Sequence, residues 1–134
     1  MRASRRLAIL LPMFSDAVLD HFQNPRNAGE LSDANVRVEV SNPVCGDVLQ
    51  LAVRVEDGRT VEARFLCRGC TTSIACASLL TEQLRGRTLA EAQALTAQSL
   101  SRLLGELPAA TFHGAELAAD AVQTMLRHIA AKNR

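Results

Sequence analysis

Side chains that can bind a soft metal ion lie in three separate stretches of this 134-residue chain. Cys45 and Asp47 flank a glycine that is typical of a turn. Cys70 follows an alternating hydrophobic run, and His113 precedes the last stretch of helical spacing. Two thiolates, an imidazole and a carboxylate suit tetrahedral Zn(II), Fe(II) or an iron–sulfur cluster. These residues predict a metal centre, provided that the fold brings the three stretches together.

Two of these residues are expected at the start of a helix. Hydrophobic residues alternate up to Cys67, and after Gly69 they recur at helical spacing, so Cys70 should lie where a strand gives way to a helix. Free backbone N–H groups and the positive end of the helix dipole favour a thiolate there. At His113 the same dipole disfavours an imidazolium and keeps a ring nitrogen available for a metal.

Each candidate ligand also has an ordinary structural explanation. Cys45 could be a small buried hydrophobic residue, although its place in a turn favours a ligand. Asp47 could equally cap that turn through its side chain. His113 alone would more often be a structural residue at a helix start, so its assignment depends on the cysteines. His21 and His128 have no such neighbours in the sequence and are expected at the surface.

The two remaining cysteines suggest other chemistry or none. Cys67 and Cys70 form a C-x-x-C pair, which resembles a dithiol redox site. The preceding chain does not alternate strands with helices as a dithiol redox fold does, and Cys67 shares the inward face of Phe65, so this interpretation is the less favoured one. Cys76 lies about 120° around the helix from Cys70 and is expected in the core.

The elements that must position these residues are strands first and helices afterwards. Ser15 should cap a helix that begins at Asp16 and ends at Asn24-Pro25. Alternating apolar residues predict strands over 36–40, 49–55 and 60–66, the last two joined by an Asp-Gly hairpin. Helical spacing and capping patterns predict helices that begin near residues 71, 88, 97 and 114.

This order predicts an α+β fold: a three-stranded antiparallel meander sheet with helices packed on one face. In a meander, the loop after the first strand and the exit of the third strand lie at the same end of the sheet. Cys45, Asp47 and Cys70 can therefore converge. We expect a single domain over residues 13–134, preceded by a flexible, dispensable N-terminal extension over residues 1–12.

Composition excludes several classes of function. A formal net charge of +1 and the absence of Trp and Tyr argue against nucleic-acid binding. No apolar run approaches the roughly 20 residues of a membrane-spanning helix. Four cysteines without a convincing secretion signal indicate free thiols or metal ligands in a cytoplasmic protein. The sequence shows no nucleophile–base pair and no phosphate-binding glycine loop, so we do not expect an enzyme.

Several short motifs follow one another in the order found in a known family. They are Phe14–Asn27 with its N-P-R-N turn, Cys45-Gly46-Asp47, Ala63-Arg64-Phe65, Gly69-Cys70, Ser73-Ile74-Ala75, Ser78-Leu79, Thr81-Glu82, Leu107-Pro108 and His113. From Met13 almost to its C-terminus, the chain resembles the iron–sulfur cluster assembly scaffold family. Within that family it is similar to the IscU type, which is also found as the N-terminal domain of NifU.

The resemblance implies a scaffold that takes sulfur from a cysteine desulfurase and binds iron or a [2Fe–2S] cluster. Such a scaffold holds the cluster loosely and passes it to apo iron–sulfur proteins. The resemblance also implies roles for individual residues: Cys45 and Cys70 as thiolate ligands, His113 as a further ligand, and Asp47 as the residue that keeps the cluster labile. A hard carboxylate is a poor partner for a soft cluster, which agrees with the role given to Asp47.

Two departures from the family pattern affect this expectation. The family has His-Cys where this chain has His113-Gly114, so the third cysteine, the expected sulfur acceptor, is missing. The stretch 107–111 lacks the second proline and the lysine of the family's chaperone-recognition motif, which leaves a chaperone partner open. An alternative is therefore kept: a zinc-binding sulfur-relay or interaction module that docks on a cysteine desulfurase and builds no cluster.

Overall fold

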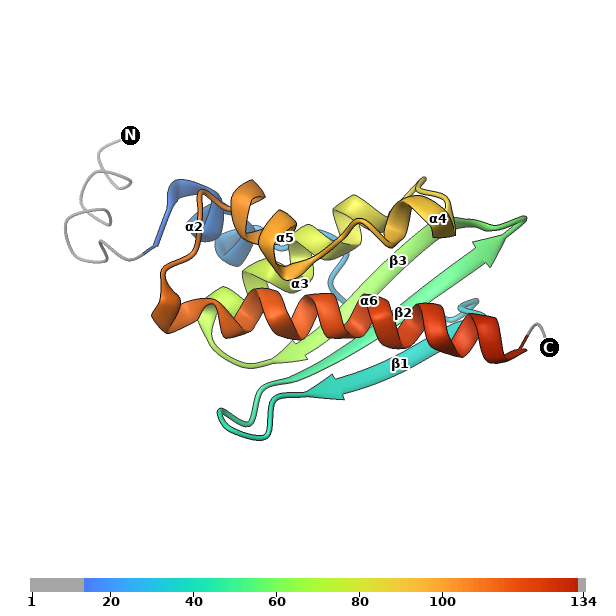
Figure 1. Cartoon of the computed structure of the whole chain (residues 1–134), viewed down its shortest axis with the longest axis horizontal. Helices are drawn as coiled ribbons and strands as arrows, with labels where there is room; N and C mark the ends of the chain where they lie inside the picture. The colour runs from blue at the N-terminus through green and yellow to red at the C-terminus, as the bar shows by residue number, and fades with distance from the viewer. Residues whose placement is uncertain (1–13, 133–134) are drawn as a thin grey trace.

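The computed structural model describes residues 14–132, and the expected extension over residues 1–12 lies outside them. In chain order the elements are α2 (Asp16–Gln23), β1 (Val36–Ser41), β2 (Val48–Glu56), β3 (Arg59–Arg68), α3 (Thr71–Leu84), α4 (Leu89–Ala92), α5 (Ala97–Leu103), the 3₁₀-helix η1 (Ala109–Thr111) and α6 (His113–Lys132). The expected α+β architecture is confirmed: the strands pair antiparallel in the order β1-β2-β3, and the helices cover one face of the sheet (Figure 1).

The sheet is a meander because short links join its strands. Asp57 and Gly58 connect β2 to β3 with φ angles of 53° and 73°, as a tight two-residue hairpin turn requires. The third strand extends beyond the expected 60–66 at both ends, because its partner β2 pairs with it as far as Arg68. Segment 27–29 then pairs with the free edge of β3 through two backbone hydrogen bonds to Phe65. This pairing covers an edge that would otherwise be open to another strand.

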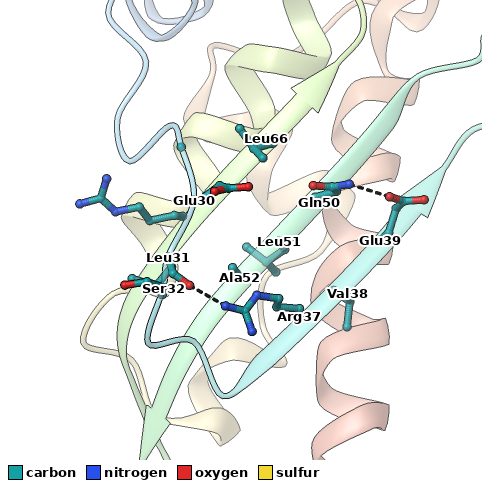
Figure 2. Close-up of a pocket in the computed structure, with 12 residues that line it drawn as sticks. Glu30, Leu31, Ser32, Arg37, Val38, Glu39, Gln50, Leu51, Ala52 and Leu66 are labelled. Carbon is teal, nitrogen blue, oxygen red and sulfur yellow. Dashed lines mark hydrogen bonds between the residues drawn. The ribbon is translucent and has the colours of Figure 1, made fainter.

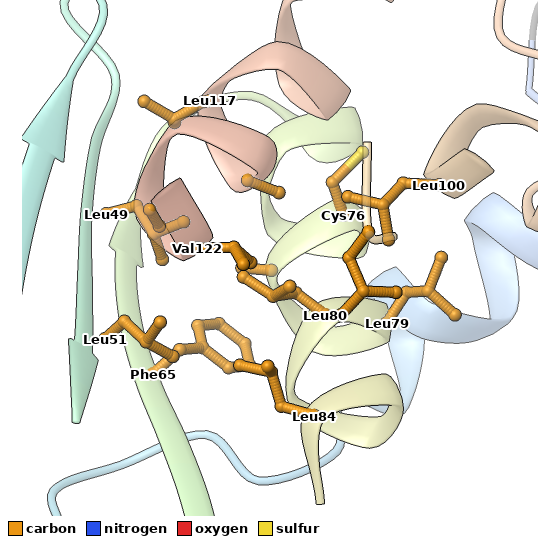
Figure 3. Packing of buried hydrophobic residues seen from close by; sticks show 14 of the residues in the cluster. Leu49, Leu51, Phe65, Cys76, Leu79, Leu80, Leu84, Leu100, Leu117 and Val122 are labelled. Atoms are coloured by element: carbon orange, nitrogen blue, oxygen red, sulfur yellow. The ribbon is translucent and has the colours of Figure 1, made fainter. Parts of the chain in front are cut away.

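The hydrophobic core lies between the inner face of the sheet and helices α3 and α6 (Figure 3). α3 is buried on most sides, because β3, α6 and α2 pack around it. Leu80 and Leu84 of α3 are fully buried, as is Met125 of α6, and Phe65 of the sheet lies near Leu84 (Figure 3). The start of α6 lies against the start of α3 at Gly114, and both starts carry candidate ligands.

His21 is buried, contrary to the expectation that it lies at the surface, whereas His128 is exposed as expected. Nδ1 of His21 lies 2.8 Å from the Ser78 hydroxyl, which also accepts a 2.8 Å hydrogen bond from the backbone N–H of Arg26. Nε2 lies 3.5 Å from a Glu82 carboxylate oxygen. The turn after α2 holds the side of α2 that carries His21 against α3, and the sequence pattern gave no sign of that contact. Within residues 14–132, no helix is long and apolar enough to cross a membrane.

Candidate metal centre

The four candidate ligands converge at one end of the sheet. The β1–β2 loop, the β3–α3 turn and the start of α6 meet there, although they are far apart in the sequence (Figure 1). One ligand atom from each of Cys45, Asp47 and His113 lies within 4.8 Å of the others. Cys70 lies beside this three-residue group, with its Sγ 3.6 Å from Nε2 of His113.

The β1–β2 loop presents Cys45 to solvent because Asn42 organises the turn. The Asn42 carbonyl accepts a 2.8 Å hydrogen bond from the N–H of Gly46, and its side-chain oxygen accepts one of 2.9 Å from the N–H of Val44. Gly46 has a φ of 76°, a left-handed conformation that favours glycine. The loop therefore leaves Cys45 exposed and turns the next side chain, Asp47, inward.

Asp47 is 6% exposed, and its carboxylate lies in a tight polar cradle. The Ser73 hydroxyl donates a 2.5 Å hydrogen bond to Oδ2. Gly69 forms the floor of the cradle, because a Cβ atom there would lie 2.7 Å from the Asp47 Cγ. Burial by itself would raise the pKa of Asp47, but hydrogen bonds from Ser73, from the backbone N–H of Cys70 and from the thiols of Cys45 and Cys70 together hold that pKa below its usual value. The carboxylate is thus kept as an anion.

Cys70 and His113 occupy the helix starts that the sequence predicted for them. Cys70 is the N-cap residue of α3, is exposed, and has its Sγ 3.3 Å from the Ser73 hydroxyl oxygen. His113 is the first residue of α6, one position earlier than the helix was expected to begin. Its Nε2 lies 3.8 Å from Oδ2 of Asp47. Two sulfurs, one nitrogen and one oxygen therefore face a common space that solvent can reach.

This arrangement can bind a thiophilic metal and also release it. Exposed thiols at Cys45 and Cys70 are accessible to an incoming ion or cluster and to a partner that removes it. Thiolate and imidazole are good ligands for iron and zinc, whereas a carboxylate is a harder ligand that suits a soft cluster poorly. A mixed set of this kind, open to solvent, favours exchange over permanent storage.

The other two cysteines do not belong to the group. Cys67 pairs with Leu49 in the sheet and is half-buried; its burial, with the charges of Asp47 and Cys70 nearby, raises the pKa of its thiol to about 11. Cys76 is fully buried, as expected, and burial raises its pKa to about 12. All four cysteines are free thiols. Because a neutral thiol is a poor nucleophile, the raised pKa of Cys67 argues against dithiol chemistry at Cys67 and Cys70.

Gly114 lies in the contact between α3 and α6, directly after His113. A Cβ atom at this position would lie 3.1 Å from the backbone of Thr72 and Ser73. Gly114 is buried, and the lack of a side chain there lets the starts of α3 and α6 approach each other closely.

Sequence reasoning missed Ser73 as part of the site. This residue lies three positions after Cys70 and therefore on the same face of α3, which is the signal that could have identified it. The contact between Gly69 and the Asp47 carboxylate was also missed, because the topology places the two segments together but the sequence does not show which of their atoms touch.

A separate hollow of about 520 Å³ lies on the outer face of the sheet, beneath the loop at residues 29–32 (Figure 2). None of the four candidate ligands lines it. Two of the hydrogen bonds along its lining are known: Arg37 donates to the carbonyl of Leu31, and Gln50 donates to Glu39. The hollow offers no converging set of metal ligands among its lining residues.

Comparison with known proteins gives a consistent result. The NifU-like N terminal domain family matches residues 13–134. An iron–sulfur cluster assembly scaffold protein IscU 1 from Archaeoglobus fulgidus is 41% identical over 121 residues, covering 90% of this chain and 79% of the relative. The scaffold protein IscU from Haemophilus influenzae is 41% identical over 123 residues, covering 89% of this chain and 97% of the relative.

A solved structure supports the fold alone. The N-terminal part of a nitrogen-fixing NifU-like protein from Brucella abortus superposes with a TM-score of 0.62 at 17% identity, covering 90% of this chain and 85% of that chain. The family match, the two relatives and the architecture agree. The chain belongs to the family of NifU-like N-terminal domains and IscU-type iron–sulfur cluster assembly scaffolds.

Proposed function

We propose that this scaffold carries iron or a [2Fe–2S] cluster on Cys45, Asp47, Cys70 and His113, and that it passes the cluster to apo iron–sulfur proteins. The observation that supports this proposal is the meeting of two exposed thiols, an imidazole and a carboxylate from the β1–β2 loop, the β3–α3 turn and the start of α6. The cluster is cargo, and the chain acts as a scaffold and not as an enzyme. Family membership supplies the class of cargo, and the geometry supplies the residues.

A cysteine desulfurase is the proposed source of sulfur. The exposed thiols of Cys45 and Cys70 are the ones that a desulfurase persulfide could reach. A thiolate of this chain would attack the outer sulfur of that persulfide; the new S–S bond forms here, and the desulfurase cysteine leaves as a thiolate. Val44, which is 94% exposed beside Cys45, offers an apolar contact for such a partner.

A zinc-binding module that docks on a desulfurase is the second candidate. The same four side chains are of the types that bind Zn(II) in tetrahedral sites, and Gly114 supplies no third thiol to the site. The two candidates differ in cargo, because zinc would remain bound whereas a cluster must be formed and then released.

Metal analysis followed by cluster assembly distinguishes them. The protein is purified without oxygen, its iron and zinc are counted, and iron, cysteine and a desulfurase are then added. A visible cluster band that disappears when an apo-ferredoxin is added, with matching gain of holo-ferredoxin, supports the scaffold. One tightly bound zinc per chain that blocks cluster formation under all conditions supports the second candidate.

A further inference from the structure

We infer that Ser73 is a positioning residue that weakens Asp47 as a metal ligand and so promotes release of the bound metal or cluster. This inference rests on the proposed function of the four-residue site and adds a residue to it. Ser73 is 1% exposed and lies in the first turn of α3, between Asp47 and Cys70.

The hydroxyl of Ser73 contacts the carboxylate oxygen that faces the site. Oδ2 of Asp47 accepts the 2.5 Å hydrogen bond from Ser73, and the same oxygen lies 3.8 Å from Nε2 of His113. A metal held by His113 and Asp47 would therefore share Oδ2 with the Ser73 hydroxyl. A hydrogen bond to a carboxylate oxygen draws electron density from it, which makes that oxygen a weaker metal ligand.

The single proton of Ser73 is committed to Asp47. A serine hydroxyl has one O–H donor, so it can donate to only one of its two neighbours at a time. The 2.5 Å contact to Asp47 uses that donor, whereas the 3.3 Å contact to Cys70 involves a weaker sulfur partner. Ser73 therefore acts on the site chiefly through Asp47.

Asp47 would keep its place without Ser73. The backbone N–H of Cys70 donates to the carboxylate, and the absence of a side chain at Gly69 leaves a close-fitting floor beneath it. Removing the Ser73 hydroxyl should thus free Oδ2 for a metal without releasing the Asp47 side chain into solvent.

The test compares Ser73→Ala with the wild-type chain, using Co(II) as the metal. Each protein is loaded with Co(II) without oxygen, excess EDTA is added, and loss of the thiolate-to-cobalt absorption is timed. Ser78→Ala is the matched control, because Ser78 is also a buried serine of α3 but hydrogen-bonds near His21, away from the site. Asp47→Ala and the double variant Asp47→Ala/Ser73→Ala complete a double-mutant cycle.

Ser73→Ala should release Co(II) about tenfold more slowly than wild type, the effect of removing one hydrogen bond to a charged group. Ser78→Ala should match wild type, and in the Asp47→Ala background the Ser73 substitution should change the rate by less than about twofold. Release at the wild-type rate or faster, an equal effect of Ser78→Ala, or an effect that persists without Asp47 would overturn the inference.

The Co(II) experiment, taken together with the cluster assembly experiment described under the proposed function, separates this inference from that function. A wild-type chain that binds Co(II) but forms no cluster overturns the proposed cargo and still tests Ser73 through the metal release rate. A wild-type chain that fails to bind Co(II) overturns both.

Discussion

Asp47 lies in the site because two residues close to it in space, Gly69 and Ser73, accommodate and fix its carboxylate. Gly69 removes the Cβ that would collide with its carboxylate, and Ser73 donates to the oxygen that faces His113. The sequence identified Asp47 but left its role divided between turn cap and ligand. In the structure, the Asp47 carboxylate accepts several hydrogen bonds and also lies close to His113. Local sequence alone does not reveal this arrangement.

Gly69→Ala should destabilise the fold and disturb the site. The added Cβ would lie 2.7 Å from the Asp47 Cγ, so the carboxylate must move, at a cost of about 1–3 kcal/mol in the free energy of unfolding. Urea unfolding measures this cost. Combining the change with Asp47→Ala removes the collision and should restore most of the stability; a double variant as unstable as the sum of the two single ones would contradict the explanation.

Gly114→Cys tests whether position 114 can supply a further thiol ligand to the site. We predict that this variant retains more cluster after reconstitution, because a thiol beside His113 would add a soft ligand to the site. It should also lose about 1 kcal/mol of stability, since its Cβ would press on the α3 backbone at 3.1 Å. Gly114→Ala carries the same steric cost without the thiol, so equal cluster retention in both variants would show that position 114 does not serve the site.

At the level of elements, most boundaries could be predicted from local chemistry. Ser15 caps α2 and Thr88 opens α4 with a capping box, as their sequence patterns indicated. The Asp57-Gly58 turn also has the predicted hairpin conformation. The length of β3 was not predicted, because pairing along β2 as far as Arg68 decides it, and a periodic pattern within one strand does not record its partner.

Helix α3 should be the element that is most sensitive to core substitutions. Leu80 is fully buried in the middle of α3, so Leu80→Ala should cost about 2–5 kcal/mol in the free energy of unfolding. Leu103 of α5 is 50% exposed, and Leu103→Ala should change stability by less than about 1 kcal/mol. Chemical denaturation followed by circular dichroism compares the two; similar losses would mean that α3 is not the centre of the core.

For the whole molecule, the approximate arrangement of the site followed from topology. A meander places the β1–β2 loop and the exit of β3 together, which is why Cys45, Asp47 and Cys70 could be grouped in advance. His113 joins them because α6 packs along α3 and β1, a contact between distant segments. Burial of His21 could not be predicted for the same reason, since it depends on how α2 docks against Ser78 and Glu82 of α3.

His21 should make the stability of the whole chain depend on pH. Burial, with Arg26 nearby, holds the pKa of His21 below its usual value, although Glu82 and Asp20 oppose the effect. The folded state therefore binds fewer protons here than the unfolded state does. The contribution of His21 to the free energy of unfolding is complete above its unfolded pKa of about 6.5, and it is lost as the pH falls through its folded pKa.

His21→Asn checks this dependence, because an amide oxygen can accept from Ser78 but does not titrate in this range. Unfolding free energies measured from about pH 7 to pH 5 should show the advantage of wild type over His21→Asn shrinking as the pH falls. An advantage that stays constant or grows over the same range would mean that His21 does not bind its proton as the structure indicates.

The proposal that the four residues hold one cargo is tested most directly by reconstituting the cluster on single variants. Wild type, Cys45→Ala, Cys70→Ala and His113→Ala are compared with Cys76→Ala, a cysteine variant in the core, by iron content and visible circular dichroism. We predict a [2Fe–2S] spectrum for wild type and Cys76→Ala, and loss of most bound iron in the other three. Full iron content and an unchanged spectrum in Cys45→Ala and Cys70→Ala would contradict the account.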